Sequence, residues 1–260
     1  PPHKEMPEHS PDNRHRLEMT RKMADAMNMP GVVEVSDMEM NRTGKSYTAD
    51  TLKEIKAQYP DAQLWLLMGT DMFLTLHLWY KPEEILDLAC ICAFGRTEQD
   101  GEEIFAPQRE YLAQNFPNAT LQTITLPGLV EISSTELRAG LEDGSAAKYL
   151  LPSVYGYILM EGLYGMKPDL KHLDIPELRA CSYSMVRAKR VPHIRGTEEE
   201  AVRLAKRWGA DEVLARRAGI LHDCTKYWEL EEHLAVCDKY GAQLDELERR
   251  AVKLLHSKSG

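Results

Sequence analysis

An uncharged apolar run at residues 64–68, Leu-Trp-Leu-Leu-Met, is the clearest pattern in the chain. Such a run predicts a strand buried on both faces, as in parallel sheets that carry helices on each side. Gly69 ends the run, and Asp71, His77 and Trp79 follow it. Because ligands of open α/β sheets lie beyond the carboxyl ends of the strands, this turn is a candidate binding site. An ordinary strand-to-helix turn with a core tryptophan is the competing interpretation.

Strand and helix patterns alternate through the first 165 residues. Apolar spacing, cap residues and prolines predict helices at residues 10–27, 48–58, 82–88, 107–114 and 152–160. Short apolar runs predict further strands at 32–35, 89–94 and 121–126. The alternation predicts an α/β fold with a doubly wound, parallel sheet.

The pattern changes at residue 167. Two prolines and several charges in residues 167–176 indicate a linker. Beyond the linker no strand pattern occurs, and helices are predicted at 177–189, 197–208, 211–221, 230–240 and 244–256. The chain is therefore predicted to hold an α/β domain at 1–166 and an all-α domain at 177–260.

Composition and charge exclude several classes of protein. The 260 residues carry a net charge of −9, which argues against a general nucleic-acid-binding surface. The five cysteines form neither a CxxC pair nor a secreted framework, which favours reduced cytosolic thiols. No apolar stretch reaches the roughly 18–20 residues that cross a bilayer, and nothing resembles a signal peptide. We expect a cytoplasmic protein without a membrane partner.

A second candidate site lies at residues 132–138, Ile-Ser-Ser-Thr-Glu-Leu-Arg. Ser133, Ser134 and Thr135 open a predicted helix, and free N–H groups at a helix N-terminus hold phosphate. Arg138 lies one turn further and adds a guanidinium. A plain capping box with an exposed arginine is the alternative.

The predicted helical domain carries spaced histidines. His193, His222, Asp223 and His256 offer imidazoles and a carboxylate, which are suitable ligands for a divalent transition metal. Adjacent residues on a helix diverge by about 100°, so His222 and Asp223 share a metal only if the helix end distorts. A lone buried histidine is more often a satisfied core group than a ligand.

The motifs of this half are His193-Ile-Arg-Gly, Gly219-Ile-Leu-His222-Asp223-x-x-Lys226 and Leu254-Leu-His256-Ser-Lys-Ser-Gly260. They resemble the HD-domain phosphohydrolases, specifically bacterial symmetrical diadenosine tetraphosphatases. The resemblance implies a dinuclear centre of Fe²⁺/Fe³⁺ or Mn²⁺ that cleaves diadenosine tetraphosphate to two ADP. It also implies His193, His222, Asp223 and His256 as metal ligands, with Asp223 and Lys226 in catalysis. A further histidine and a late aspartate of this family are expected beyond Gly260.

The first half carries another series of motifs: Pro1-Pro-His-Lys4, Glu34-Val-Ser-Asp37-x-Glu39, Gly44-x-Ser46-Tyr47-Thr48-x-Asp50, Leu66-Leu-Met-Gly69-Thr-Asp71, Trp79 and the 132–138 stretch. It resembles bacterial nicotinate-nucleotide adenylyltransferases of the HxGH nucleotidylyltransferase superfamily. The resemblance implies AMP transfer from Mg²⁺-ATP to nicotinate mononucleotide. Lys4 would contact phosphate, and the implied substrate pocket consists of Tyr47, Thr48, Asp71 and Trp79. Ser133, Ser134, Thr135 and Arg138 would hold ATP.

These resemblances predict a bifunctional enzyme of NAD biosynthesis and dinucleoside tetraphosphate hydrolysis. The first strand and HxGH segment are expected before Pro1, so the chain is read as a fragment lacking both ends and impaired alone. A monofunctional adenylyltransferase with a scaffold or nucleotide-sensing helical domain is the alternative, and a non-enzymatic nucleotide-binding module is another. A dehydrogenase is disfavoured because no GxGxxG follows a strand. A homo-oligomer is left open.

Overall fold

The computed structural model describes residues 9–95, 97, 100–124, 128, 130 and 132–260. Its contacts divide the chain into two compact units. We name residues 36–133 the sheet unit, and residues 9–35 with 134–260 the helical unit. This division follows packing, whereas the predicted boundaries at 166 and 177 refer to sequence families, and those boundaries stay a prediction.

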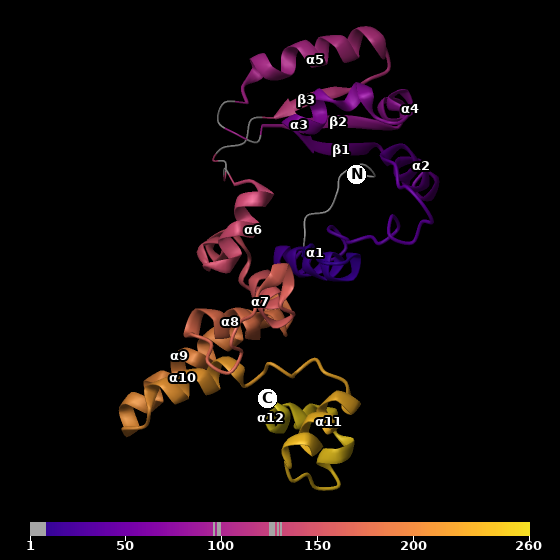
Figure 1. The fold of residues 1–260 in the computed structure, drawn as a ribbon. Coiled ribbons are helices and arrows are strands. Elements are labelled where there is room, and N and C mark those ends of the chain that lie inside the picture. The colour runs from indigo at the N-terminus through magenta and orange to yellow at the C-terminus, as the bar shows by residue number, and fades with distance from the viewer. Residues whose placement is uncertain (1–8, 96, 98–99, 125–127, 129, 131) are drawn as a thin grey trace. The chain divides into compact units, whose positions relative to one another are not determined.

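The sheet unit contains a parallel sheet in the order β1-β2-β3 (Figure 1). Its strands are β1 (Leu64–Gly69), β2 (Ala89–Phe94) and β3 (Leu121–Ile124). Leu66 pairs with Ile91, and Ile91 pairs with Leu121. The predicted parallel α/β sheet is therefore confirmed. Among the described residues, however, the strand order runs in one direction, so the second winding direction of a doubly wound sheet is not present there.

Helices precede and connect the strands of the sheet unit. They are α2 (Thr48–Gln58), α3 (Thr70–Leu74), α4 (Pro82–Leu88) and α5 (Glu102–Asn115), with a short 3-10 helix η1 (Leu76–Leu78). The predicted helices at 48–58 and 82–88 are confirmed. The predicted helix at 107–114 begins five residues earlier, because Glu102 and Glu103 suit the positive end of a helix.

The core of the sheet unit lies against one face of the sheet. Phe73, Leu76, Ile91 and Leu112 are completely buried there. On β1 burial alternates, and Trp65 and Leu67 are 45% and 65% exposed. The prediction of a strand buried on both faces is therefore wrong for β1. It holds instead for the central strand β2, because its successive residues from Ala89 to Ala93 are all buried.

Residues 32–35 do not form the predicted strand. The backbone N–H groups of Val32 and Val33 donate to the carbonyl of Met29 instead, in a turn after α1 (Asn13–Met27). A strand needs a partner for its backbone groups, and here the turn satisfies them locally.

The helical unit contains no strand among its described residues. Besides α1 it consists of α6 (Ser134–Glu142), α7 (Pro152–Met160), α8 (Ile175–Ser184), α9 (Val191–Trp208), α10 (Glu212–Leu221), α11 (Leu230–Tyr240) and α12 (Val252–Ser259). Short 3-10 helices are η2 (Ser145–Tyr149), η3 (Leu163–Gly165), η4 (Ala188–Arg190) and η5 (Glu248–Arg250). Helical structure after residue 175 agrees with the prediction, while its assignment to an HD domain stays a prediction.

Some helix boundaries differ from the predicted ones. The helix predicted at 197–208 begins at Val191, because Pro192 in the first turn has no N–H that the helix would leave unpaired. The single helix predicted at 244–256 is wrong: residues 244–247 are not helical, and the 3-10 helix η5 and α12 follow, separated at Ala251. No described helix is long and apolar enough to cross a membrane.

Candidate functional site

The sheet unit has a cavity of about 500 Å³ beside the carboxyl end of β1. Residues from the loop before α2, from α2 itself and from the segment after β1 form its walls. The lining residues are Glu39, Ser46, Tyr47, Thr48, Met72, Thr75, Leu78, Trp79, Tyr80 and Ile85. We name this cavity the sheet-unit pocket. Its position is the one at which open α/β sheets bind ligands.

Aromatic side chains give the sheet-unit pocket fixed walls. The Trp79 indole donates to Thr75 Oγ1 at 3.4 Å, which orients the ring. The Tyr47 and Tyr80 rings pack with centroids 4.3 Å apart. Trp79 and Tyr47 thus present apolar surfaces with defined orientations to a planar ligand.

The structure brings together three of the predicted substrate-binding residues, Tyr47, Thr48 and Trp79. Asp71 is the second residue of α3 and is exposed, and it is not among the lining residues of the pocket. Lys4 lies outside the described residues.

A network around Arg42 holds the loop before α2 against that helix. Arg42 Nη1 donates to Ser46 at 2.7 Å and to Thr51 at 2.8 Å, and Arg42 Nε donates to Glu54 at 2.9 Å. Thr51 donates in turn to Glu39 at 2.6 Å. The hydrogen bond to Glu54 raises the pKa of Arg42. Sequence reasoning missed Arg42, although a single arginine between Glu39 and Glu54 was a signal for it.

The predicted ATP-binding residues lie at the start of α6. Ser134 and Thr135 are exposed in its first turn, and Ser133 directly precedes it. Arg138 Nη2 donates to Thr135 Oγ1 at 3.4 Å. The helix therefore begins where the hydroxyl residues predict it, and their contact with ATP stays a prediction.

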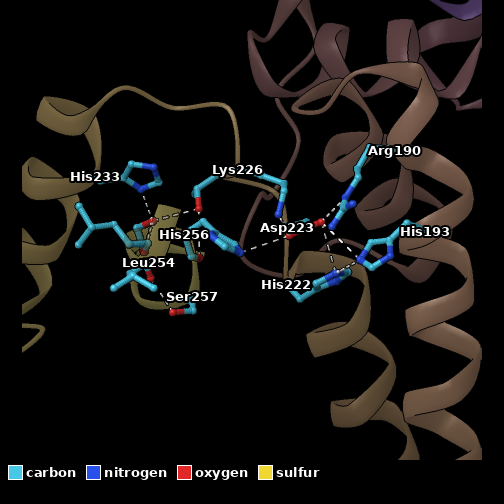
Figure 2. Close-up of polar contacts among 12 residues, drawn as sticks. Arg190, His193, His222, Asp223, Lys226, His233, Leu254, His256 and Ser257 are labelled. Carbon is cyan, nitrogen blue, oxygen red and sulfur yellow. Dashed lines mark hydrogen bonds and ion pairs between the residues drawn. The ribbon is translucent and has the colours of Figure 1, made fainter. Parts of the chain in front are cut away.

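A compact cluster of possible metal ligands lies in the helical unit (Figure 2). Ligand atoms of His193, His222 and Asp223 all lie within 4.8 Å of one another. The two Nε2 atoms are 3.0 Å apart, and they lie 3.5 and 3.6 Å from Asp223 Oδ2. Two imidazoles and a carboxylate around one point fit a divalent transition metal.

The end of α10 explains how adjacent residues meet in this cluster. The helix ends at Leu221, and His222 and Asp223 lie in the turn that follows. His222 Nδ1 lies 2.7 Å from the carbonyl of Gly219. That carbonyl requires a donor, so the proton is assigned to Nδ1 and the lone pair of Nε2 faces the cluster.

Asp223 is 1% exposed and is surrounded by cationic and imidazole groups. Arg190 Nε lies 2.5 Å from its Oδ2, on the side of His193 and His222. Lys226 Nζ and His256 Nε2 lie 3.4 and 3.6 Å from the other oxygen, Oδ1. Burial alone would raise the pKa of Asp223, but the Arg190 hydrogen bond and nearby positive charges outweigh it and lower the pKa. The carboxylate is therefore ionised at neutral pH.

The same environment affects His193 and includes a group that sequence reasoning missed. Burial and the positive charge of Arg190 lower the pKa of His193, which favours the neutral imidazole that ligates metals. His256 does not belong to the three-residue group, and it approaches only the second oxygen of Asp223. Arg190 was missed, although its position three residues before His193 was a signal.

Comparisons with known proteins show that the chain is similar to adenylyltransferases. Over 131 residues the chain is 35% identical to a probable nicotinate-nucleotide adenylyltransferase of Lachnoclostridium phytofermentans. The match covers 50% of this chain and 64% of the relative, so the chain spans less than two thirds of that protein. No protein-family model matches the chain.

Two solved structures of Plasmodium falciparum nicotinic acid mononucleotide adenylyltransferase are also similar. The complex with APC is 22% identical with a TM-score of 0.48, and the match covers 60% of this chain and 77% of that one. The complex with NaAD is 21% identical with a TM-score of 0.48, and the match covers 60% and 76%.

Proposed function

We propose that this protein transfers the adenylyl group of ATP to nicotinate mononucleotide, giving deamido-NAD and pyrophosphate. The similarity to the bacterial relative supports the reaction class. The observation that carries the proposal is the sheet-unit pocket, whose walls include Tyr47, Thr48 and Trp79. A pyridine ring with a carboxylate and a ribose phosphate suits a pocket that is lined by both aromatic and hydroxyl side chains.

Trp79 and the start of α2 are proposed to recognise different parts of the nucleotide. Trp79, held by Thr75, offers a flat face on which a pyridine ring stacks. No side chain caps the start of α2 at Tyr47, and the Asp50 N–H donates to the Tyr47 carbonyl, so the N–H groups of Thr48 and Ala49 are the ones proposed to meet the nicotinate carboxylate. This helix end would favour nicotinate over the uncharged nicotinamide.

The reaction needs positioning and charge neutralisation. A phosphate oxygen of nicotinate mononucleotide attacks the α-phosphorus of ATP, and the bond to the β-phosphate bridging oxygen breaks as pyrophosphate leaves. Ser133, Ser134, Thr135 and Arg138 are proposed to hold the ATP phosphates, and Mg²⁺ accompanies ATP as part of the substrate. Lys4 and Asp71 are proposed to act on the mononucleotide side.

An assay of the full-length protein with ATP and nicotinate mononucleotide tests this proposal. We expect deamido-NAD as the product. We expect Trp79→Ala to raise the KM for nicotinate mononucleotide by about tenfold, because the surface on which the pyridine ring stacks is lost. Trp208→Ala is the matched control, since Trp208 is 75% exposed on α9. If the full-length protein makes no deamido-NAD, the proposal is wrong.

A second activity is favoured by the cluster of His193, His222 and Asp223. We propose that the helical unit holds a divalent metal centre, Fe²⁺/Fe³⁺ or Mn²⁺, and hydrolyses diadenosine tetraphosphate to two ADP. The donor set fits such a metal, because the lowered pKa of His193 favours its neutral form, Nδ1 of His222 contacts the Gly219 carbonyl and leaves Nε2 towards the cluster, and Asp223 is ionised. A bound metal would supply an activated water and neutralise phosphate charge.

The residues around the cluster have proposed roles in this hydrolysis. His193, His222, Asp223 and His256 would hold metal, and the two oxygens of Asp223 face different histidines. Lys226 and Arg190 are cations beside Asp223, and both are suited to hold phosphate oxygens of the substrate. Phosphate binding by Arg190 would also release Asp223 Oδ2 for coordination.

Metal content and hydrolysis of the purified full-length protein test the second proposal separately. We expect bound Fe or Mn and ADP as product, with both lost in His222→Ala. His172→Ala is the control, because His172 is exposed and pairs with Asp169 away from the cluster. Absence of metal together with intact deamido-NAD synthesis would favour the monofunctional alternative with a scaffold or sensor.

A further inference from the structure

His233 is a buried polar side chain outside the metal-ligand cluster. It lies on α11 and is 0% exposed. Its Nδ1 lies 2.7 Å from Ser259 Oγ on α12, and its ring packs near Trp228. Its Nε2 is buried and has no hydrogen-bond partner within the described part of the chain. A buried imidazole with one engaged nitrogen calls for an explanation.

The hydrogen bonds assign the tautomer of His233. Ser259 Oγ lies 3.0 Å from Thr225 Oγ1 and 3.1 Å from the carbonyl of Leu255, and its single proton serves those acceptors. Ser259 therefore accepts from Nδ1–H of His233. The other tautomer would leave a buried N–H unpaired at Nε2, which costs more than an unpaired acceptor.

The chain of contacts continues to a proposed metal ligand. Thr225 Oγ1 donates to the backbone carbonyl of His256 at 3.3 Å. Thr225 is 2% exposed and lies two residues after Asp223, in the same turn. The network therefore ties the backbone of α12 to the turn that carries the carboxylate (Figure 2).

An anchor of this kind matters because α12 carries His256, a proposed metal ligand. The position of the His256 imidazole, 3.6 Å from Asp223 Oδ1, consequently depends on what holds α12. Partners behind a metal ligand commonly set its affinity for the metal.

We propose that His233 is a positioning residue that fixes the His256 imidazole beside Asp223. It acts through Ser259 and Thr225, and it touches neither substrate nor metal. The inference rests on the proposed metal-dependent activity of the helical unit and adds to it a residue from α11.

Two variants of His233 in the full-length protein separate positioning from general stability. His233→Leu removes the donor at Nδ1 and also the unpaired acceptor at Nε2, so thermal unfolding is expected within a few degrees of the wild type. His233→Asn keeps an N–H donor close to the position of Nδ1 and serves as the rescue. His172→Leu, at an exposed histidine, is the matched control.

Two measurements report on the proposal. Hydrogen exchange without metal is expected to be faster at residues 252–259 in His233→Leu, and to return towards wild type in His233→Asn. Binding of Mn²⁺ alone is measured from the electron paramagnetic resonance signal of the free ion. We expect its affinity to weaken by about tenfold in His233→Leu.

The outcomes distinguish this inference from the activity on which it rests. If the wild type binds no Mn²⁺, the metal centre is wrong, while faster exchange that His233→Asn reverses still supports positioning of α12. Unchanged exchange at residues 252–259 in His233→Leu overturns the inference whether or not metal binds. Faster exchange with unchanged Mn²⁺ affinity also overturns it, because the ligand would then not depend on the anchor.

Discussion

Single side chains hold the loop before α2 in place, and Arg42 donates hydrogen bonds to Ser46, Thr51 and Glu54 there. We expect Arg42→Lys to raise KM for nicotinate mononucleotide by about tenfold, since an ammonium cannot span Ser46, Thr51 and Glu54 together. Steady-state kinetics measure the effect, and Arg21→Lys at an exposed position is the control. An unchanged KM for nicotinate mononucleotide would show that the loop does not depend on the hydrogen bonds of the Arg42 guanidinium.

A buried carboxylate makes a pH-dependent contribution to the helical unit. Glu198 on α9 is 3% exposed and receives hydrogen bonds from Arg179 and Arg216. The Arg179 hydrogen bond outweighs burial and lowers the pKa of Glu198 below its ordinary value of 4.5. Its stabilisation is therefore present above pH 4.5 and is lost as the pH falls through the lowered pKa.

Glu198→Gln tests this contribution. We expect it to reduce the free energy of unfolding by about 1–3 kcal/mol at neutral pH, because charged hydrogen bonds are lost. The difference from the wild type should shrink once the pH falls below 4.5, as measured by urea denaturation across pH. Glu200→Gln is the control, since its pair with Arg203 is exposed and contributes little. A difference that does not vary with pH would contradict the assignment.

The backbones of α7 and α8 approach each other closely at Gly156. A Cβ atom there would lie 1.9 Å from the carbonyl oxygen of Ala180. We expect Gly156→Ala to destabilise the protein by about 3 kcal/mol, because the two backbones must separate. Gly196→Ala on α9 is the matched control and should stabilise by about 0.5–1 kcal/mol, since nothing lies within 4 Å of its Cβ position. Thermal unfolding measures both, and equal effects would refute the close packing.

For the whole molecule, each unit has its own apolar core. Leu112 is completely buried in the core of the sheet unit, and Leu159 is buried in that of the helical unit. We expect Leu112→Ala and Leu159→Ala each to cost about 2–5 kcal/mol and to increase hydrogen exchange mainly within the affected unit. Peptide-resolved exchange measures this. Equal loss of protection in both units after either substitution would contradict two separate cores.

The spacing of apolar residues, together with prolines and helix caps, predicted most elements of both units. The helices at 82–88, 152–160 and 230–240 and the strand at 89–94 have the predicted bounds, because prolines, caps and apolar spacing act within a few residues. The predicted strand at 32–35 was wrong. A strand needs a partner strand for its backbone groups, whereas here the N–H groups of Val32 and Val33 bond to the Met29 carbonyl in a turn. Strand burial was likewise assigned to β1 instead of β2, because the position of a strand within a sheet is not a local property.

Motifs predicted that His193, His222 and Asp223 lie together, and the structure confirms their proximity, while metal binding stays a prediction. Their convergence depends on the end of α10 and on the packing of α9 against it, across 29 residues of sequence. Only contacts between segments distant in sequence identified the proposed roles of Arg190, Arg42 and His233. Local sequence fixes backbone preferences over one or two turns, whereas the direction and partners of a side chain depend on how the elements pack.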